Sequence, residues 1–198
     1  MYFFTSYGMK MTHTTDQHLI KSTLNGDTKA FAQLVDRHQS YVFTLVVRMI
    51  KVKEESEEVA QDVFIKAYRS LKDFKGDSKF STWLYRIAYR AALDHIRKNK
   101  KRQKTYELLE EITESNVNLV DTPFESIQKV ERKEHVKKCI AQLSESDAAV
   151  VTLFYFEELS IKEIGMITQL TEDNIKVKLH RSRKKLFELL QSFSAINE

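Results

Sequence analysis

Hydrophobic residues recur at intervals of three and four along most of this chain, which is the period of amphipathic α-helices. The first such stretch covers residues 27–50 and follows a turn signal at residues 25–27. A second covers residues 54–71, and the sequence KGDS at residues 75–78 ends it. A third runs from near Ser81, where Ser81 or Thr82 is expected to cap the helix, to about Lys100. The pattern therefore predicts three amphipathic helices in the first half of the chain.

The same period returns near Ser126 and continues towards the end of the chain. The sequence SESD at residues 144–147 is a capping signature before an apolar stretch. Ser160 and Glu163 fit a capping box that opens the next helix. Thr171 is the expected cap of a final helix that runs to about Leu190. That helix is predicted to turn four residues inward: Ile175, Leu179, Leu186 and Leu190.

The segment between the two helical parts differs in charge. Residues 105–128 contain no Lys or Arg, and they hold six acidic residues together with Pro123, the single proline of the chain. Such a composition favours a flexible acidic linker. With only 4 Gly and 1 Pro, the chain is predicted to be all-α. We expect a flexible extension (residues 1–14), a helical domain (15–102), the linker (103–128) and a second small helical domain (129–192).

The composition, with 42% hydrophobic and 30% charged residues, is that of a globular protein. The net charge of +4 is mild, so its distribution carries more information than its size. One cysteine, Cys139, fits a reducing compartment, and it is predicted to be a small buried residue. No apolar run approaches the roughly 20 residues of a membrane span, and the N-terminus does not resemble a signal peptide. A cytoplasmic protein is expected.

Catalytic chemistry finds little support in the sequence. The six histidines are scattered and lack metal-ligand spacing, and no glycine-rich phosphate loop or nucleophile elbow is present. The adjacent carboxylates Glu57-Glu58 and Glu110-Glu111 point to different faces of a helix and are interpreted as surface charge. We therefore expect no enzyme activity, no catalytic residue, no metal, no cofactor and no small-molecule substrate.

Residues 160–190 have the pattern of a helix-turn-helix, in which a second helix enters the major groove of DNA. The first turns of that helix are expected to face base edges, through Thr171, Glu172, Asp173, Asn174, Lys176, Val177 and Lys178. The basic residues that follow are expected to meet phosphates: Arg181, Arg183, Lys184 and Lys185. A helical hairpin with a solvated basic face is the alternative.

Residues 80–102 combine aromatic and basic side chains on one helix. Tyr85 and Tyr89 share a face that Arg86 and Arg90 border. Aromatic rings stack on unpaired bases while arginines follow the backbone, so the mixture is typical of single-stranded or melting DNA. Phe80 is expected in the core, and Trp83 fits either the core or a base contact. The basic run that begins at Arg97 suits a phosphate contact or a solvated helix end.

Both groups of residues, in this order, resemble bacterial sigma factors of the extracytoplasmic-function type, over about residues 16–190. The sequence EEVAQDVFIKAYRSLKDF (57–74) is similar to the helix that docks on the β′ clamp helices of RNA polymerase. The sequence FSTWLYRIAYRAALDHIRK (80–98) is similar to the segment that opens and reads the −10 element, and residues 143–186 to the domain that reads the −35 element. This chain departs from the family's usual residues at four positions. The family often has Asn where Arg90 stands, Pro at the position of Ser144, Arg near that of Ala148 and Gly at that of Gln169.

The resemblance implies a sigma factor that binds core polymerase, recognises duplex −35 DNA and captures the melted −10 strand. It assigns polymerase contacts to Glu58, Gln61 and Asp62. It implies that a loop holds a flipped base of the −10 element; the loop consists of Lys75, Gly76, Asp77, Ser78 and Lys79. It also implies −10 contacts by residues of the following helix: Trp83, Tyr85, Arg86, Tyr89, Arg90 and Arg97. The implied partners are core polymerase through its β′ clamp helices and β flap, promoter DNA and an anti-sigma factor. A stand-alone helix-turn-helix regulator and a helical adaptor protein are the alternatives.

Overall fold

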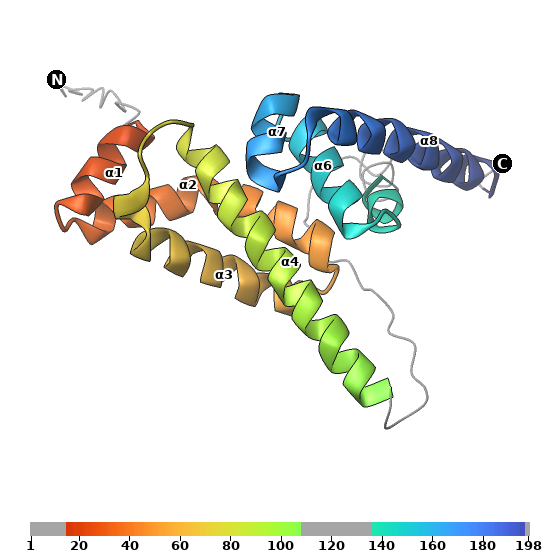
Figure 1. The fold of residues 1–198 in the computed structure, drawn as a ribbon, viewed down its shortest axis with the longest axis horizontal. Coiled ribbons are helices and arrows are strands. Elements are labelled where there is room, and N and C mark those ends of the chain that lie inside the picture. The colour runs from red at the N-terminus through yellow and green to blue at the C-terminus, as the bar shows by residue number, and fades with distance from the viewer. Residues whose placement is uncertain (1–14, 108–135, 197–198) are drawn as a thin grey trace, which may run out of the picture.

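The computed structural model describes residues 15–107 and 136–196, which contain helices and connecting loops but no strand (Figure 1). The predicted all-α fold is confirmed. The first part, called here the N-terminal bundle (15–107), holds α1 (Asp16–Leu24), α2 (Thr28–Ile50), α3 (Lys53–Arg69), the 3-10 turn η1 (Leu71–Asp73) and α4 (Phe80–Glu107). The second, called the C-terminal unit (136–196), holds a helical stretch at 136–141, α6 (Glu145–Tyr155), α7 (Ile161–Thr168) and α8 (Glu172–Ile196). The predicted extension, most of the predicted linker and the helical start near Ser126 lie outside the described residues.

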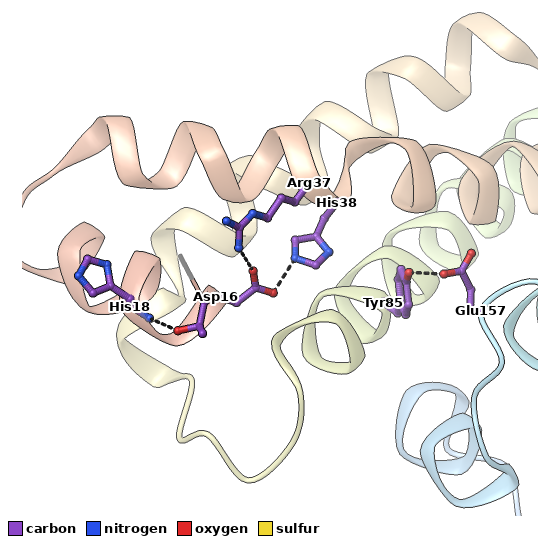
Figure 2. Close-up of polar contacts among 7 residues, drawn as sticks. Asp16, His18, Arg37, His38, Tyr85 and Glu157 are labelled. Atoms are coloured by element: carbon purple, nitrogen blue, oxygen red, sulfur yellow. Dashed lines mark hydrogen bonds and ion pairs between the residues drawn. The ribbon is translucent and has the colours of Figure 1, made fainter. Parts of the chain in front are cut away.

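Helix α1 was not predicted as a separate element. Thr15 caps it by accepting a hydrogen bond from the backbone N–H of His18. Asp16 then ties it to α2, because its carboxylate lies 3.0 Å from Arg37 Nη1 and 2.8 Å from His38 Nε2 (Figure 2). Nine residues give too few turns for the period to be distinctive, so this helix depends on contacts with α2.

Helix α4 begins and ends outside its predicted limits. It starts at Phe80, so the expectation that Ser81 or Thr82 caps it is wrong. Thr82 is instead buried within the first turn, and its hydroxyl has no hydrogen-bond partner among the described residues. The helix continues past Lys100 to Glu107 and so includes the first residues of the predicted linker. Its C-terminal half extends beyond the other helices of the bundle (Figure 1).

The helix starts of the C-terminal unit agree with the predicted caps. The Ser144 hydroxyl accepts the N–H of Asp147, and Ser160 and Glu163 form both halves of a capping box. The Thr171 hydroxyl accepts the N–H of Asn174. The final helix is longer than predicted and reaches Ile196, and Leu190, expected to face inward, is 36% exposed. Cys139 is buried as predicted, and burial raises the pKa of its thiol.

The two parts of the chain share one hydrophobic core. Helix α6 packs on α2, and α7 packs on α4, as Figure 1 shows. Side chains from both parts form one continuous buried cluster, which joins residues such as Leu45 and Leu84 of the bundle to Leu153, Ile164 and Ile167 of the C-terminal unit. The C-terminal unit therefore packs against one side of α4. This packing determines which side chains of α4 face solvent.

Candidate nucleic-acid interface

A helix-turn-helix forms where α7 meets α8. Gly165 allows the backbone at Leu170 to lie close to α7, because a Cβ on residue 165 would be 3.3 Å from the Leu170 carbonyl oxygen. Gln169 occupies the turn with a φ of 63°, in the left-handed region, and its N–H donates to the Gly165 carbonyl at 2.8 Å. Ile164 and Ile175 are fully buried between the helices. The absence of glycine at Gln169 therefore leaves the turn geometry intact.

The outer side of α8 presents most of the residues expected to contact DNA. Its first turns expose Thr171, Glu172, Asp173, Asn174, Lys176 and Val177, and Arg181, Arg183 and Lys184 are exposed further along. Val177 is 47% exposed, so its methyl groups are available for an apolar contact. Lys178 is half-buried and donates to Asp147 of α6 at 2.8 Å, and Lys185 donates to the Gln142 carbonyl. These two lysines hold α8 in place as well as adding positive charge.

The loop before α4 is exposed, while the aromatic residues that follow it are packed together. Lys75, Gly76, Asp77 and Lys79 are exposed, Ser78 is half-buried, and Gly76 has a φ of 80°. Phe80 is buried, as predicted. Trp83 is half-buried, and its ring lies 5.4 Å from that of Phe74 and 5.6 Å from that of Phe80. Trp83 thus borders both the core and the loop.

Tyr85 and Tyr89, the two rings expected to stack on bases, are buried in the shared core. They are only 3% and 5% exposed, whereas Arg86, Arg90 and Arg97 remain exposed. Tyr85 donates its hydroxyl to the Glu157 carboxylate at 2.6 Å (Figure 2). Burial, followed by this hydrogen bond and the charge of Glu157, raises the pKa of the Tyr85 phenol. No feature of the sequence pattern indicated Glu157, which lies 72 residues further along.

Arg48 on α2 contacts the C-terminal end of α6, close to Glu157. Its guanidinium centre is 3.8 Å from the centroid of the Phe156 ring, and its Nη1 donates to the Thr152 hydroxyl at 3.2 Å. Desolvation by burial lowers the pKa of Arg48 to about 10, with the nearby charge of Glu157 acting in the opposite direction. The Arg48–Thr152 and Tyr85–Glu157 hydrogen bonds are therefore half-buried polar contacts between the two parts.

Three further polar contacts join the bundle to the C-terminal unit. Lys51 Nζ donates to the Leu143 carbonyl at 2.8 Å. Lys100 pairs with Glu145 at 3.0 Å, and Lys79 pairs with Glu163 at 3.5 Å. The lysines of the last two pairs are largely exposed, so these pairs are each worth at most about 1 kcal/mol.

The residues expected to contact polymerase lie together on α3. Glu58, Gln61 and Asp62 are all exposed. Beside them, an open groove of about 390 Å³ runs between α2 and α3, and Gln61 lines it together with the half-buried rings of Phe43 and Phe64. Acidic side chains next to an apolar groove suit a partner with a mixed basic and apolar surface.

The described residues hold neither a cluster of metal ligands nor a membrane-spanning helix. Within residues 15–107 and 136–196, no three His, Cys, Asp or Glu side chains gather as metal ligands would. Among the helices of the same residues, none has both the length and the apolarity needed to cross a bilayer.

The described residues are all-α and include an exposed helix-turn-helix, which is the architecture of a DNA-binding protein. Residues 34–102 match the family model of sigma-70 region 2, and residues 133–186 match that of sigma-70 region 4. The RNA polymerase sigma-H factor of Pseudomonas aeruginosa is 33% identical, over 91% of this chain and 96% of its own length. SigW of Bacillus subtilis, an extracytoplasmic-function sigma factor, is 34% identical, over 87% of this chain and 95% of its own.

The fold is also similar to that of the sigma factor RpoE in a complex with the anti-sigma factor NepR from Bartonella quintana. That likeness has a TM-score of 0.71 at 20% identity, and it covers 83% of this chain and 98% of the other. The chain belongs to the sigma-70 family of transcription initiation factors, as a member of the extracytoplasmic-function type.

Proposed function

We propose that this chain acts in the cytoplasm as a promoter-specificity subunit without catalytic chemistry of its own, while the polymerase makes the RNA. Residues 15–102 bind core polymerase and the −10 element, residues 129–192 bind the −35 element, and residues 103–128 connect them. The contact with polymerase involves the β′ clamp helices and the β flap. An anti-sigma factor holds the chain inactive, as in the complex of the similar RpoE with NepR.

The exposed outer face of α8 is the observation that carries the −35 assignment. Asn174 has the two-pronged geometry that reads adenine, Lys176 suits guanine, and the exposed methyls of Val177 suit the methyl of thymine. Arg181 and Arg183, further along the helix, supply the sequence-independent attraction to phosphates. The helix therefore combines residues that specify bases with residues that position the protein.

The −10 assignment rests on the loop at residues 75–79 and on α4. An exposed loop that contains Gly76 in the left-handed region gives a backbone that a flipped base can approach closely. Arg86, Arg90 and Arg97 are exposed on α4 and attract the backbone. Tyr85 and Tyr89 are buried in this structure, so their rings must be uncovered before they can stack on bases. On α3, the exposed residues Glu58, Gln61 and Asp62 supply the polymerase contact.

Run-off transcription tests the overall function. Purified core polymerase is incubated with this chain and a library of bacterial promoter fragments, and the transcripts are sequenced. We expect transcripts that begin at a defined distance from a shared pair of elements. A folded chain that binds duplex DNA but gives no promoter-specific transcript would instead identify a stand-alone regulator.

Two substitutions on α8 test the residue assignments on duplex −35 DNA. Asn174→Ala is expected to relax selection at one base position, at a cost of about 1–3 kcal/mol on the preferred base. Arg181→Ala is expected to weaken binding to all sequences alike and to reduce the salt slope by about 1. Lys21→Ala on α1 is the control for the loss of an exposed charge. Equal effects of all three changes would refute the assignment.

A further inference from the structure

We propose that a cavity between α4 and the turn of the helix-turn-helix binds a small phosphorylated molecule of the size of a nucleoside monophosphate. The cavity has a volume of about 340 Å³, and both α4 and the segment from the end of α7 into the turn line it. Pockets that hold small ligands have volumes of about 300–1,000 Å³, so a molecule of this size fits. The inference goes beyond the proposed function, because the ligand is neither polymerase nor promoter DNA.

Two arginines give the cavity its positive charge. Arg90 and Arg97 line it from α4, where their spacing along the sequence places them on the same face, two turns apart. Arg90 has no hydrogen-bond or ion-pair partner among residues 15–107 and 136–196, and Arg97 meets the exposed Asp94 at 3.4 Å. A guanidinium group binds phosphate through two parallel hydrogen bonds, and the unpaired Arg90 is available for such a contact.

Asp94 narrows the class of ligand. Its carboxylate also lines the cavity, so it repels a free phosphate ion, whereas it accepts hydrogen bonds from hydroxyl groups. Acidic residues bind ribose hydroxyls in this way in dinucleotide-binding folds. The ion pair between Asp94 and Arg97 is largely exposed and therefore weak, so a ligand can replace it. A phosphate ester with neighbouring hydroxyl groups thus suits the cavity better than phosphate alone.

The remaining lining residues come from both parts of the chain. Gln169 is exposed on the turn, and its side-chain amide has no hydrogen-bond partner within the two described ranges. The hydroxyl of Tyr89, on α4, likewise has none there. Leu93 and Ile167 add apolar side chains against which a base can pack. Unpaired polar groups from distant parts of the sequence therefore converge on one cavity, as in a ligand site.

Isothermal titration calorimetry with the full chain tests the site. The probes are AMP, GMP, CMP and UMP, each alone, together with the corresponding nucleosides, inorganic phosphate and a short oligothymidine. We expect at least one monophosphate to bind with a Kd below about 1 mM. Its nucleoside and inorganic phosphate are each expected to bind at least about ten-fold more weakly, because each lacks one half of the contacts.

Variants on both sides of the cavity locate the binding. Arg90→Ala and Arg97→Ala should each weaken binding of that monophosphate about ten-fold or more, and Gln169→Ala about two- to ten-fold. Lys98→Ala is the matched control, because it removes an exposed positive charge of α4 from outside the cavity lining. Thermal unfolding of each variant, measured alongside, separates a lost contact from a lost fold.

Three results would overturn the proposal: no binding of any monophosphate, an equal loss in Lys98→Ala, or full binding in Gln169→Ala. Oligothymidine that binds through Arg90 and Arg97 while no monophosphate binds would assign both arginines to a DNA strand alone, and it would also overturn the proposal. Run-off transcription tests the proposed function separately, because the calorimetry contains neither polymerase nor promoter DNA.

Discussion

Replacing Gln169 by glycine should stabilise the protein. Gln169 sits in the left-handed region with a φ of 63° and a ψ of 20°, and its side chain is exposed. A residue with a Cβ loses about 1–2 kcal/mol there, whereas glycine loses about 0.5–1 kcal/mol of extra chain entropy on folding. The difference gives a net gain of about 0.5–1 kcal/mol for Gln169→Gly. The control is Gln169→Ala, which removes the same side chain and keeps the strain.

Thermal and urea unfolding measure this gain. In a cooperative unit of this size, each kcal/mol raises Tm by about 2–4 °C, so Gln169→Gly should raise Tm by about 1–4 °C. Independent unfolding of the smaller C-terminal unit would roughly double that shift, so the size of the change also reports whether the shared core couples the two parts. A Gln169→Gly variant no more stable than Gln169→Ala would refute the reasoning about the turn.

Three further predictions concern other helix ends and contacts. Ser160→Ala should cost about 1 kcal/mol in urea unfolding. Hydrogen bonds from Ser160 lower the pKa of Glu163, so the stability that this carboxylate contributes is present above about pH 4.5. It is lost as the pH falls through the lowered pKa. The Ser160→Ala variant should therefore lose less stability on acidification than wild type. Phe74→Ala should shift the emission of Trp83, the single tryptophan, to longer wavelength. Asp16→Ala should speed hydrogen exchange in α1 without affecting α8.

Most helix starts were predictable because helix caps are local. A hydroxyl three residues before a backbone N–H needs no information from elsewhere, and the caps at Ser144, Ser160 and Thr171 all formed. The end of α4 was predicted too early. The sequence changes from basic to acidic after Lys104, but it offers no glycine or proline to stop the helix there. A change from basic to acidic residues does not by itself end a helix.

The two surfaces assigned to DNA were predictable to different degrees. The exposed side of α8 follows from its period, because the buried positions Ile175 and Leu179 fix which side faces outward. Tyr85 is hydrogen-bonded to Glu157 and Arg48 to Thr152, at separations of 72 and 104 residues. The hydrophobic period shows on which face of a helix a ring lies. It does not show which other element packs on that face, because that depends on residues far away in the sequence.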